Sequence, residues 1–181
     1  MRDSGIGWPL EELWVAGDLL EGPESLEAGS VVLVLDVPPD ELTWLAKHPT
    51  GEWVGSQLRL GKRPFVWVYR PLVWPVWNHR HRRVARFWSA EHGPDTDVLE
   101  SLAEQQLNRL PVVEPPVENL VQQLSEELTA SRRHLRGVLD HYWDYDWRRD
   151  HKGLDETPED HLWRAAQAVS EIEDALSELG K

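Results

Sequence analysis

The feature that most constrains this chain is one continuous apolar run, SVVLVLDV, from Ser30 to Val37. β-Branched residues dominate the run and no polar residue alternates within it, which is typical of a strand buried on both faces. Such a strand lies in the middle of a sheet. Two further segments predict its companions, RPFVWVYRP from Arg63 to Pro71 and RVARFW from Arg83 to Trp88.

Shorter elements are predicted around these strands. Residues 13–20 are apolar but interrupted by Gly17, which favours a strand that runs into a turn. PPDELTWLAK, residues 38–47, predicts a short helix because prolines suit its first turn. Farther along, Asp97 and Glu100 have the spacing of a capping box ahead of another helix.

After the linker LPVVEPPVE, the pattern changes to two long helices. The first carries apolar residues at three-or-four spacing, and the second begins where Thr157 can cap and Pro158 can take the first helical position. The two apolar stripes predict an antiparallel hairpin laid on the sheet or on a partner. They consist of Leu120, Leu124, Leu128, Leu135, Val138, Leu139 and Tyr142, and of Leu162, Ala165, Ala166, Val169, Ile172, Leu176 and Leu179.

The fold class is therefore predicted as α+β. We expect a small mixed sheet with flanking helices over residues 1–112 and a C-terminal helical hairpin over residues 113–181. A length of 181 residues with 11 Trp suits one globular unit. The absence of cysteine excludes disulfides and thiolate zinc sites. No apolar run approaches a membrane span and no leader pattern opens the chain, so we expect a cytoplasmic protein without a membrane partner.

The net charge of −13 is unevenly distributed, because residues 51–90 hold one acid and eight bases. Arginines here lie among tryptophans, a pattern that phosphate contacts and base stacking would need, so nucleic-acid binding through residues 59–86 is one alternative. The acidic remainder of the chain favours internal charge pairing and makes nucleic acid an unlikely partner. No third ligand accompanies His79 and His81, so we expect neither metal nor other cofactor. The candidate nucleic-acid contacts are Arg80, Arg82, Arg83 and Arg86.

The order of elements over the first 75 residues resembles that of the small nucleotidyltransferases, the class of minimal and kanamycin-modifying enzymes. The shared order is a strand, a glycine turn, a polar loop, a buried strand ending in Asp-Val-Pro, and a helix. In that family the turn is Gly-Ser, and two aspartates separated by one residue on the next strand hold magnesium ions. A third carboxylate comes from a neighbouring strand.

Carried over to this chain, the resemblance places the turn glycine at Gly17, with Asp18 where serine is expected. The metal-binding pair falls on Ser30 and Val32, which cannot supply carboxylates to a hard cation. The strand from Phe65 to Tyr69 contains no acid. The resemblance thus implies a degenerate fold, a pseudoenzyme without its metal ligands. The alternative, a general α+β arrangement without this ancestry, stays open.

The segment HYWDYDWRRDH, from His141 to His151, concentrates aromatic and charged side chains at the end of the first long helix. One reading makes it a ligand or interface site in which tryptophans surround the ligand and two arginines grip an anion; another makes it an exposed face of ion pairs. We expect Trp147 with Arg148 to face a partner and Trp143 with Trp163 to close the hairpin. The candidate site residues are Trp143, Trp147, Arg148, Arg149 and Trp163.

The function predicted from these features is noncatalytic. The protein is expected to bind a protein partner, a second copy of itself or a retained ligand through the inherited cleft. The alternative is a nucleotidyltransferase or nuclease with a displaced active site. Its candidate residues are Asp18, Asp36, Arg136 and His141, of which the last two have the spacing found in helical ribonucleases that partner minimal nucleotidyltransferases.

Overall fold

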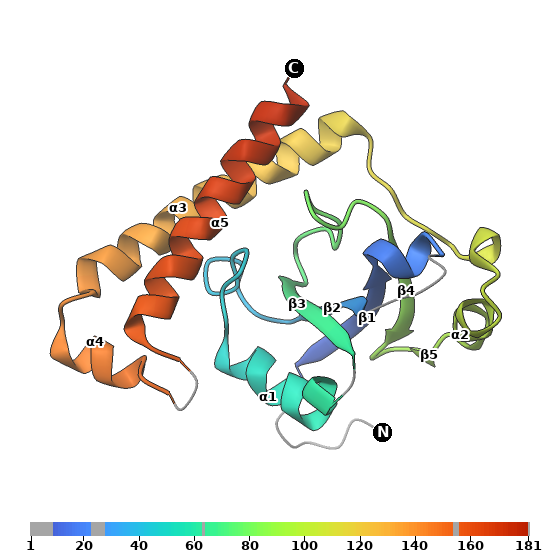
Figure 1. The fold of residues 1–181 in the computed structure, drawn as a ribbon, viewed down its shortest axis with the longest axis horizontal. Helices are drawn as coiled ribbons and strands as arrows, with labels where there is room; N and C mark the ends of the chain where they lie inside the picture. The colour runs from blue at the N-terminus through green and yellow to red at the C-terminus, as the bar shows by residue number, and fades with distance from the viewer. Residues whose placement is uncertain (1–8, 23–27, 63, 154–155, 181) are drawn as a thin grey trace.

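A computed structural model of the chain describes residues 9–22, 28–62, 64–153 and 156–180. The N-terminal segment 1–8, most of the polar loop at 23–27 and the predicted strand start at Arg63 lie outside these residues. The described strands form one mixed sheet in the order β3-β2-β1-β4-β5, in which only β2 and β3 run parallel (Figure 1). The predicted α+β class is confirmed. The strands are β1 (Leu10–Ala16), β2 (Gly29–Leu35), β3 (Phe65–Pro71), β4 (Val84–Ser89) and β5 (Gly93–Pro94).

Strand β2 lies inside the sheet and is buried on both faces, as its sequence predicts. On one face Leu33 packs with Val54 of α1 (Pro49–Gln57) and with Tyr69. On the other face Val32 packs with Val76 and Val84. The two faces therefore belong to separate cores, which explains why the strand shows no polar alternation.

The prediction of a helix at residues 38–47 is wrong. The segment forms successive turns, with backbone bonds from Glu41 to Pro38 and from Ala46 to Thr43, and α1 begins only at Pro49. Leu42 packs into the core beneath α1, whereas Trp44 packs against the C-terminal helices. Side chains two residues apart that serve opposite cores require an irregular backbone, so packing here overrides helix propensity.

Helix α2 (Thr96–Ala103) covers the β4 side of the sheet, where Val98 packs with Val15 and Ala85. The predicted cap at Asp97 is wrong. Asp95 instead accepts a hydrogen bond from the backbone N–H of Val98 and caps the helix. Single 3₁₀ turns complete this part of the fold at Gly17–Leu20, Leu60–Lys62 and Leu107–Arg109.

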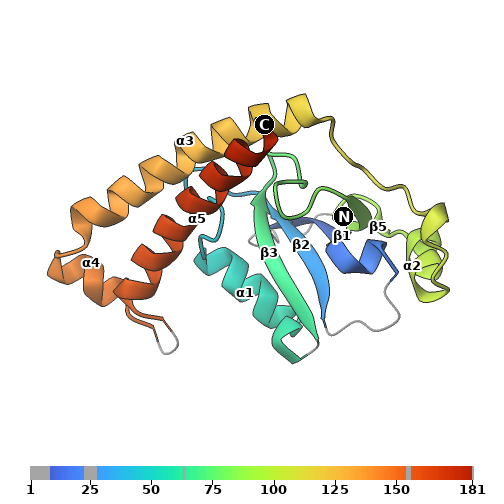
Figure 2. The same cartoon turned by 45° about the horizontal axis from the view of Figure 1, so that its top comes forward.

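The predicted helical hairpin is confirmed by α3 (Val117–His141) and α5 (Pro158–Leu179), which run side by side in opposite directions (Figures 1 and 2). The short α4 (Tyr145–Asp150) lies at the turn between them. Thr157 and Asp160 form a reciprocal capping box at the start of α5. None of the helices within the described residues is long and apolar enough to span a bilayer.

The hairpin packs on the sheet face opposite α1. Leu124 of α3 and Ile172 of α5 form a core with Trp44, and Val68 of β3 packs against this core. The buried inner face of α3 also includes Glu127, Ala130 and Ser131, whereas the predicted stripe residue Leu139 is 53% exposed. Small and polar residues thus take positions in the seam that the apolar pattern alone does not assign.

Candidate ligand cleft between the sheet and the helical hairpin

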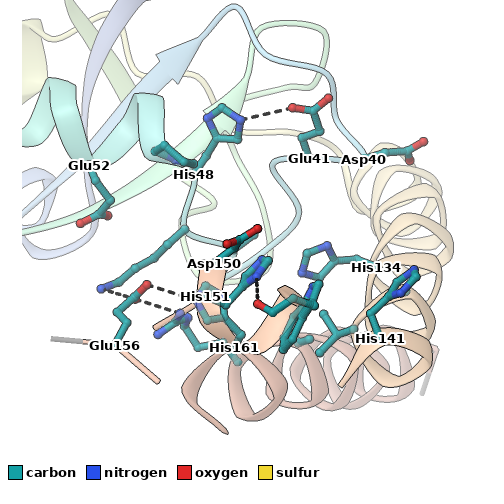
Figure 3. A pocket seen from close by; sticks show the side chains of 18 of the residues that line it. Asp40, Glu41, His48, Glu52, His134, His141, Asp150, His151, Glu156 and His161 are labelled. Carbon is teal, nitrogen blue, oxygen red and sulfur yellow. Dashed lines mark hydrogen bonds and ion pairs between the residues drawn. The ribbon is translucent and has the colours of Figure 1, made fainter. Parts of the chain in front are cut away.

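A cavity of about 620 Å³ lies between the segment at residues 40–52 and the distal half of the hairpin. Figure 3 shows His48 and Glu41 on one side of it and a group of histidines from α3, α5 and the segment between them on the other. The walls thus come from parts of the chain about 100 residues apart, and the hairpin must be docked for the cavity to exist. Its lining includes Asp40, Trp44, Lys47, Glu52, Arg133, His134, Gly137, His141, Trp147, Asp150, His151, Glu156, His161 and Arg164.

The sheet-side wall is fixed by the turns before α1. Trp44 is 5% exposed, and its indole N–H donates to Glu171 of α5 at 2.9 Å. His48 caps α1, because its Nδ1 accepts from the backbone N–H of Thr50 at 3.2 Å. Its Nε2 must then carry the proton that is directed at Glu41, 3.2 Å away. These bonds give this wall a defined set of donors and acceptors.

Three histidines, His134, His151 and His161, lie on the hairpin side of the cavity. Burial lowers the pKa of His134 and of His161, and in both cases the nearby His151 adds to the lowering. His151 stacks on Trp147 with ring centroids 4.1 Å apart. Its Nδ1 donates to the Trp147 carbonyl at 2.8 Å, which leaves Nε2 for other contacts. His134 and His161 are therefore neutral at pH 7.

This group does not amount to a metal centre. Within the described residues, no three His, Cys, Asp or Glu side chains are placed to hold one ion. What the histidines offer is a set of flat rings with hydrogen-bonding edges, suited to an organic ligand.

Cations on both walls converge on Glu156, just before α5. Lys47 Nζ and Arg164 Nη2 lie 2.8 Å and 2.9 Å from its Oε1, and His161 Nε2 lies 3.3 Å from Oε2. Burial opposes ionisation of Glu156, but the positive charges of Lys47 and Arg164 outweigh it and lower its pKa. An ion-pair cluster therefore joins the two walls at one end of the cavity.

Of the aromatic residues predicted as a site, only Trp147 lines the cavity. The prediction that Trp143 and Trp163 close the hairpin is wrong, since they are 84% and 64% exposed. Trp143 lies beyond the end of α3, and Trp163 lies on the face of α5 opposite the buried Ala165. Trp147, expected to face a partner, is instead half-buried.

The two predicted arginines of this segment are held by neighbouring acids. Arg148 donates to Glu159 at 2.7 Å and lies over the Tyr142 ring, 5.0 Å from its centroid. Arg149 pairs with Asp146 at 2.8 Å. These contacts match the reading of the segment as an exposed face of ion pairs.

The four candidates for a displaced active site are not brought together. Asp18 follows the Gly17 turn beside the start of β2, whereas Asp36 follows its end, and a seven-residue strand separates these points by about 20 Å. His141 lines the cavity and contacts Asp144 at 2.8 Å. Arg136 is exposed and outside the lining, because residues five apart on a helix point about 140° apart.

The inherited cleft expected from the resemblance is filled. Gly17 has φ 61° and lies against the start of β2, since a Cβ on it would be 3.5 Å from Ser30 Oγ. Val32, two residues farther along, is 0% exposed beneath Val76 and Val84. A ligand cannot enter where core side chains already pack, so the expectation of a retained cleft at these positions is wrong.

The basic residues are largely paired with acids, as the charge pattern favours. Arg80 contacts Glu171 at 3.2 Å and Arg86 contacts Glu12 at 2.7 Å, while Arg83 lies 3.7 Å from Glu114. Arg82 is exposed. An arginine that the sequence does not single out, Arg70, forms the most buried pair, with Glu127.

Sequence reasoning missed His134, Lys47, Glu156 and Arg164 as site residues. One local signal could have pointed to the α3 wall, because His134, Gly137 and His141 share a helix face at three-and-four spacing. Nothing local marks Lys47, Glu156 and Arg164, whose proximity depends on how the hairpin docks.

These features define a class of α+β protein in which a helical hairpin covers one face of a small mixed sheet and forms a cleft with the segment before α1. Over residues 1–178 the chain matches the family described as "Domain of unknown function (DUF7711)", and it belongs to that family. Neither the curated proteins nor the solved structures contain a match to the chain.

Proposed function

We propose that this protein is a noncatalytic binding protein that takes a small organic molecule into the cleft between the sheet and the hairpin. The observation that carries the proposal is the cavity itself. Its volume of about 620 Å³ falls within the range of small-molecule sites, and apolar, aromatic and hydrogen-bonding side chains share its wall. Trp44, Trp147 and the neutral histidines supply flat surfaces, while charged groups at its edge can orient a ligand.

The proposal retains the idea of a degenerate nucleotidyltransferase-like shell. It is supported by the antiparallel pairing of β1 with β2, the parallel pairing of β2 with β3 and the left-handed Gly17 beside Ser30. The buried Val32 supports loss of the chemistry, because its position is occupied by an apolar core. Under this proposal binding has moved from the sheet face to the junction with the hairpin.

The binding proposal is tested by comparing two substitutions at Gly137, which lines the cavity. Apart from its two chain neighbours and the nearby backbone of α3, a Cβ added at this position would meet no atom of the described residues within 4 Å, so a larger side chain has room to enter. Gly137→Leu projects a side chain into the cavity, whereas Gly137→Ala adds one methyl group.

The readout is a thermal-shift screen of metabolites, in which a true ligand at 100 times its Kd adds about 2.7 kcal/mol of stability. We expect hits that stabilise the wild type and Gly137→Ala but not Gly137→Leu, because leucine fills the space that the ligand needs. Hits that stabilise Gly137→Leu equally would exclude this cleft.

The noncatalytic part of the proposal has its own test. Incubation with labelled nucleoside triphosphates, magnesium or manganese, and a cell lysate is expected to label no product. A labelled product that disappears in Asp18→Ala or Asp36→Ala would establish the displaced-site alternative instead. The separation of those two aspartates along β2 argues against a shared metal site between them.

A second candidate function, protein binding, is favoured by the exposed aromatics near the α4 turn. Trp143, Tyr145 and Trp163 are 84%, 79% and 64% exposed, and aromatic side chains are frequent anchors of interfaces. Light scattering of the wild type and of Trp143→Ala with Trp163→Ala tests for self-association. We expect the double variant to lose any dimer while keeping the wild-type melting temperature; equal masses at all concentrations would count against a second copy as the partner.

Nucleic-acid binding is the weaker alternative. The pairing of Arg80 and Arg86 with acids reduces their availability to phosphates. We expect oligonucleotides at moderate salt to bind no better than the nonspecific range of about 1 µM to 0.1 mM. Submicromolar binding that weakens steeply with salt and is lost in Arg80→Ala with Arg82→Ala would contradict this expectation.

A further inference from the structure

Two positive side chains share one carboxylate at the end of the cavity. Lys47, from the turn before α1, and Arg164, from α5, both lie within 3 Å of the same oxygen of Glu156. Glu52, also on this wall, accepts a hydrogen bond from the Tyr69 hydroxyl at 3.2 Å. Two carboxylates, Glu156 and Glu52, therefore accompany the two cations, and the cations are in excess only when Glu156 is displaced.

The geometry of this contact is poor for a hydrogen bond. Arg164 Nη2 and Glu156 Oε1 are both buried and close, yet neither has a correctly aligned hydrogen bond among the residues that the structure describes. A guanidinium binds a carboxylate best through two parallel N–H bonds. Arg70 shows this arrangement with Glu127 elsewhere in the fold, with bonds of 2.7 Å and 2.6 Å. Arg164 thus retains hydrogen-bonding capacity that Glu156 does not use.

A second cavity of about 430 Å³ adjoins the first at these cations. The two cavities share Lys47 and Arg164, together with Trp44, Ala46 and Glu52. Beyond the shared residues the wall of the second cavity is almost entirely apolar or aromatic, and it follows the edge strand β3. This part consists of Leu45, Phe65, Val66, Trp67, Val68 and Tyr69.

The apolar wall is accessible to a ligand. Phe65 and Val66 are 37% and 59% exposed at the start of β3, whereas the end of the strand is buried. A molecule lying here would have an apolar surface beneath it and two cations at one end. With Glu156 displaced, that combination is complementary to an amphipathic anion, whereas an amphipathic amine would face repulsion from Lys47 and Arg164.

We propose that the junction of the two cavities binds the carboxylate of an amphipathic organic acid, whose apolar body lies along β3, and that Glu156 occupies the carboxylate position in the free protein. This inference deepens the proposed binding function and rests on it. The ligand exchanges one carboxylate for another, so Lys47 and Arg164 stay compensated throughout. Glu156 then acts as an internal competitor that sets the affinity.

The test uses a matched set of probes, naphthalene-2-carboxylate, its neutral carboxamide and naphthalen-2-ylmethylammonium, measured by isothermal titration calorimetry. We expect the carboxylate to bind at least tenfold more tightly than the amide and the ammonium more weakly than either. Glu156→Gln removes the competing charge and is expected to tighten carboxylate binding by about tenfold, while Lys47→Met and Arg164→Met each weaken it by at least tenfold.

Matched controls come from an exposed ion pair on the same two helices. Arg132 of α3 and Glu173 of α5 contact each other outside the cavity lining, so Glu173→Gln and Arg132→Met should leave the affinity within twofold. Lys47 is 39% exposed on a turn, which makes Lys47→Met the safer variant if Arg164→Met folds poorly. Melting curves on every variant separate lost binding from lost structure.

Two kinds of failure can be distinguished. Equal affinity for carboxylate and amide, tighter binding of the ammonium, or weaker carboxylate binding by a folded Glu156→Gln would each overturn this inference. Ala46 lines both cavities, so Ala46→Leu reports whether the probe occupies their junction. Amide binding as tight as carboxylate binding, and abolished by Ala46→Leu, would preserve the binding function while refuting the anion site. No calorimetric binding of the carboxylate at millimolar concentration would also refute the anion site, with the Gly137 comparison left to decide the broader proposal.

Discussion

The contact that most directly joins the sheet to the hairpin is the ion pair between Arg70 of β3 and Glu127 of α3. Their side chains are 1% and 0% exposed, and the guanidinium makes two hydrogen bonds to the carboxylate. Arg70 also donates twice to the Pro75 carbonyl, at 3.1 Å and 2.7 Å, and Gln123 donates to Glu127 at 3.2 Å. Replacing Glu127 by leucine leaves a buried positive charge without its counter-charge.

The magnitude follows from the burial. Breaking a fully buried ion pair from one side costs about 3 to 5 kcal/mol, because the remaining charge is neither paired nor solvated. We therefore expect Glu127→Leu and Arg70→Met each to lower the free energy of unfolding by that amount. The double variant removes both charges and leaves mainly the Pro75 carbonyl unpaired, which costs about 1 to 3 kcal/mol. The double variant should thus be more stable than either single variant.

The assay is urea unfolding at 25 °C followed by tryptophan fluorescence, with the free energy and the m-value fitted for each variant. Glu126, the exposed neighbour on α3, provides the control, and Glu126→Leu should change stability by no more than about 0.5 kcal/mol. Two results would refute the assignment of this pair as the buried link between the two layers. One is a loss of unfolding free energy below about 1 kcal/mol in Glu127→Leu, and the other is a double variant whose loss equals the sum of the single losses.

Three further predictions concern stability. Burial lowers the pKa of His81 to about 4, so the folded chain holds its imidazole in the neutral form. The corresponding stability, on the order of 3 kcal/mol, is present above pH 6.5 and is lost as the pH falls toward 4. His81→Gln should abolish this pH dependence in melting curves. Thr157→Ala removes the cap of α5 and should cost about 1 kcal/mol in urea unfolding. Trp44→Ala, at a site 5% exposed, should cost about 3 to 5 kcal/mol, whereas Trp143→Ala at 84% exposure should change the same measurement by less than about 0.5 kcal/mol.

The elements that the sequence predicts correctly are those whose burial follows one simple period. Residues 30–35 read as a strand because both faces are covered, and α3 and α5 read as helices because their stripes repeat over many turns. Thr157 is predictable as a cap because a proline and an acid follow it in the expected order. In these segments local preference and tertiary packing agree.

The sequence-based predictions are wrong where local preference and tertiary packing disagree, or where the local pattern is ambiguous. Residues 38–47 have a helix-like start, but Leu42 and Trp44 must reach separate cores. Asp95 and Asp97 both lie at the start of the same helix, and only the backbone conformation at Asp95 makes it the cap. Neither the irregular backbone at residues 38–47 nor the capping role of Asp95 can be predicted from the order of residues alone.

Most of the candidate site cannot be predicted from the sequence, because its walls come from distant segments that meet only in the folded chain. The sequence predicts an aromatic segment around Trp147, but it places Trp143 on the wrong face because α3 ends at His141 and the chain turns there. Lys47 and Arg164 are 117 positions apart and carry no motif that links them. Their common contact with Glu156 depends on the docking of α5 beside the segment before α1.

That docking makes the hairpin part of two structures at once. Through Glu127 and Leu124 the hairpin packs over the sheet face on which Val32 lies. Through His134 and Arg164 the same hairpin forms a wall of the cleft. A ligand that contacts both walls must therefore bind the docked hairpin more tightly than an undocked one, and by linkage it must stabilise docking to the same extent. The covering of the sheet face and the formation of the proposed binding cleft are consequently one structural event.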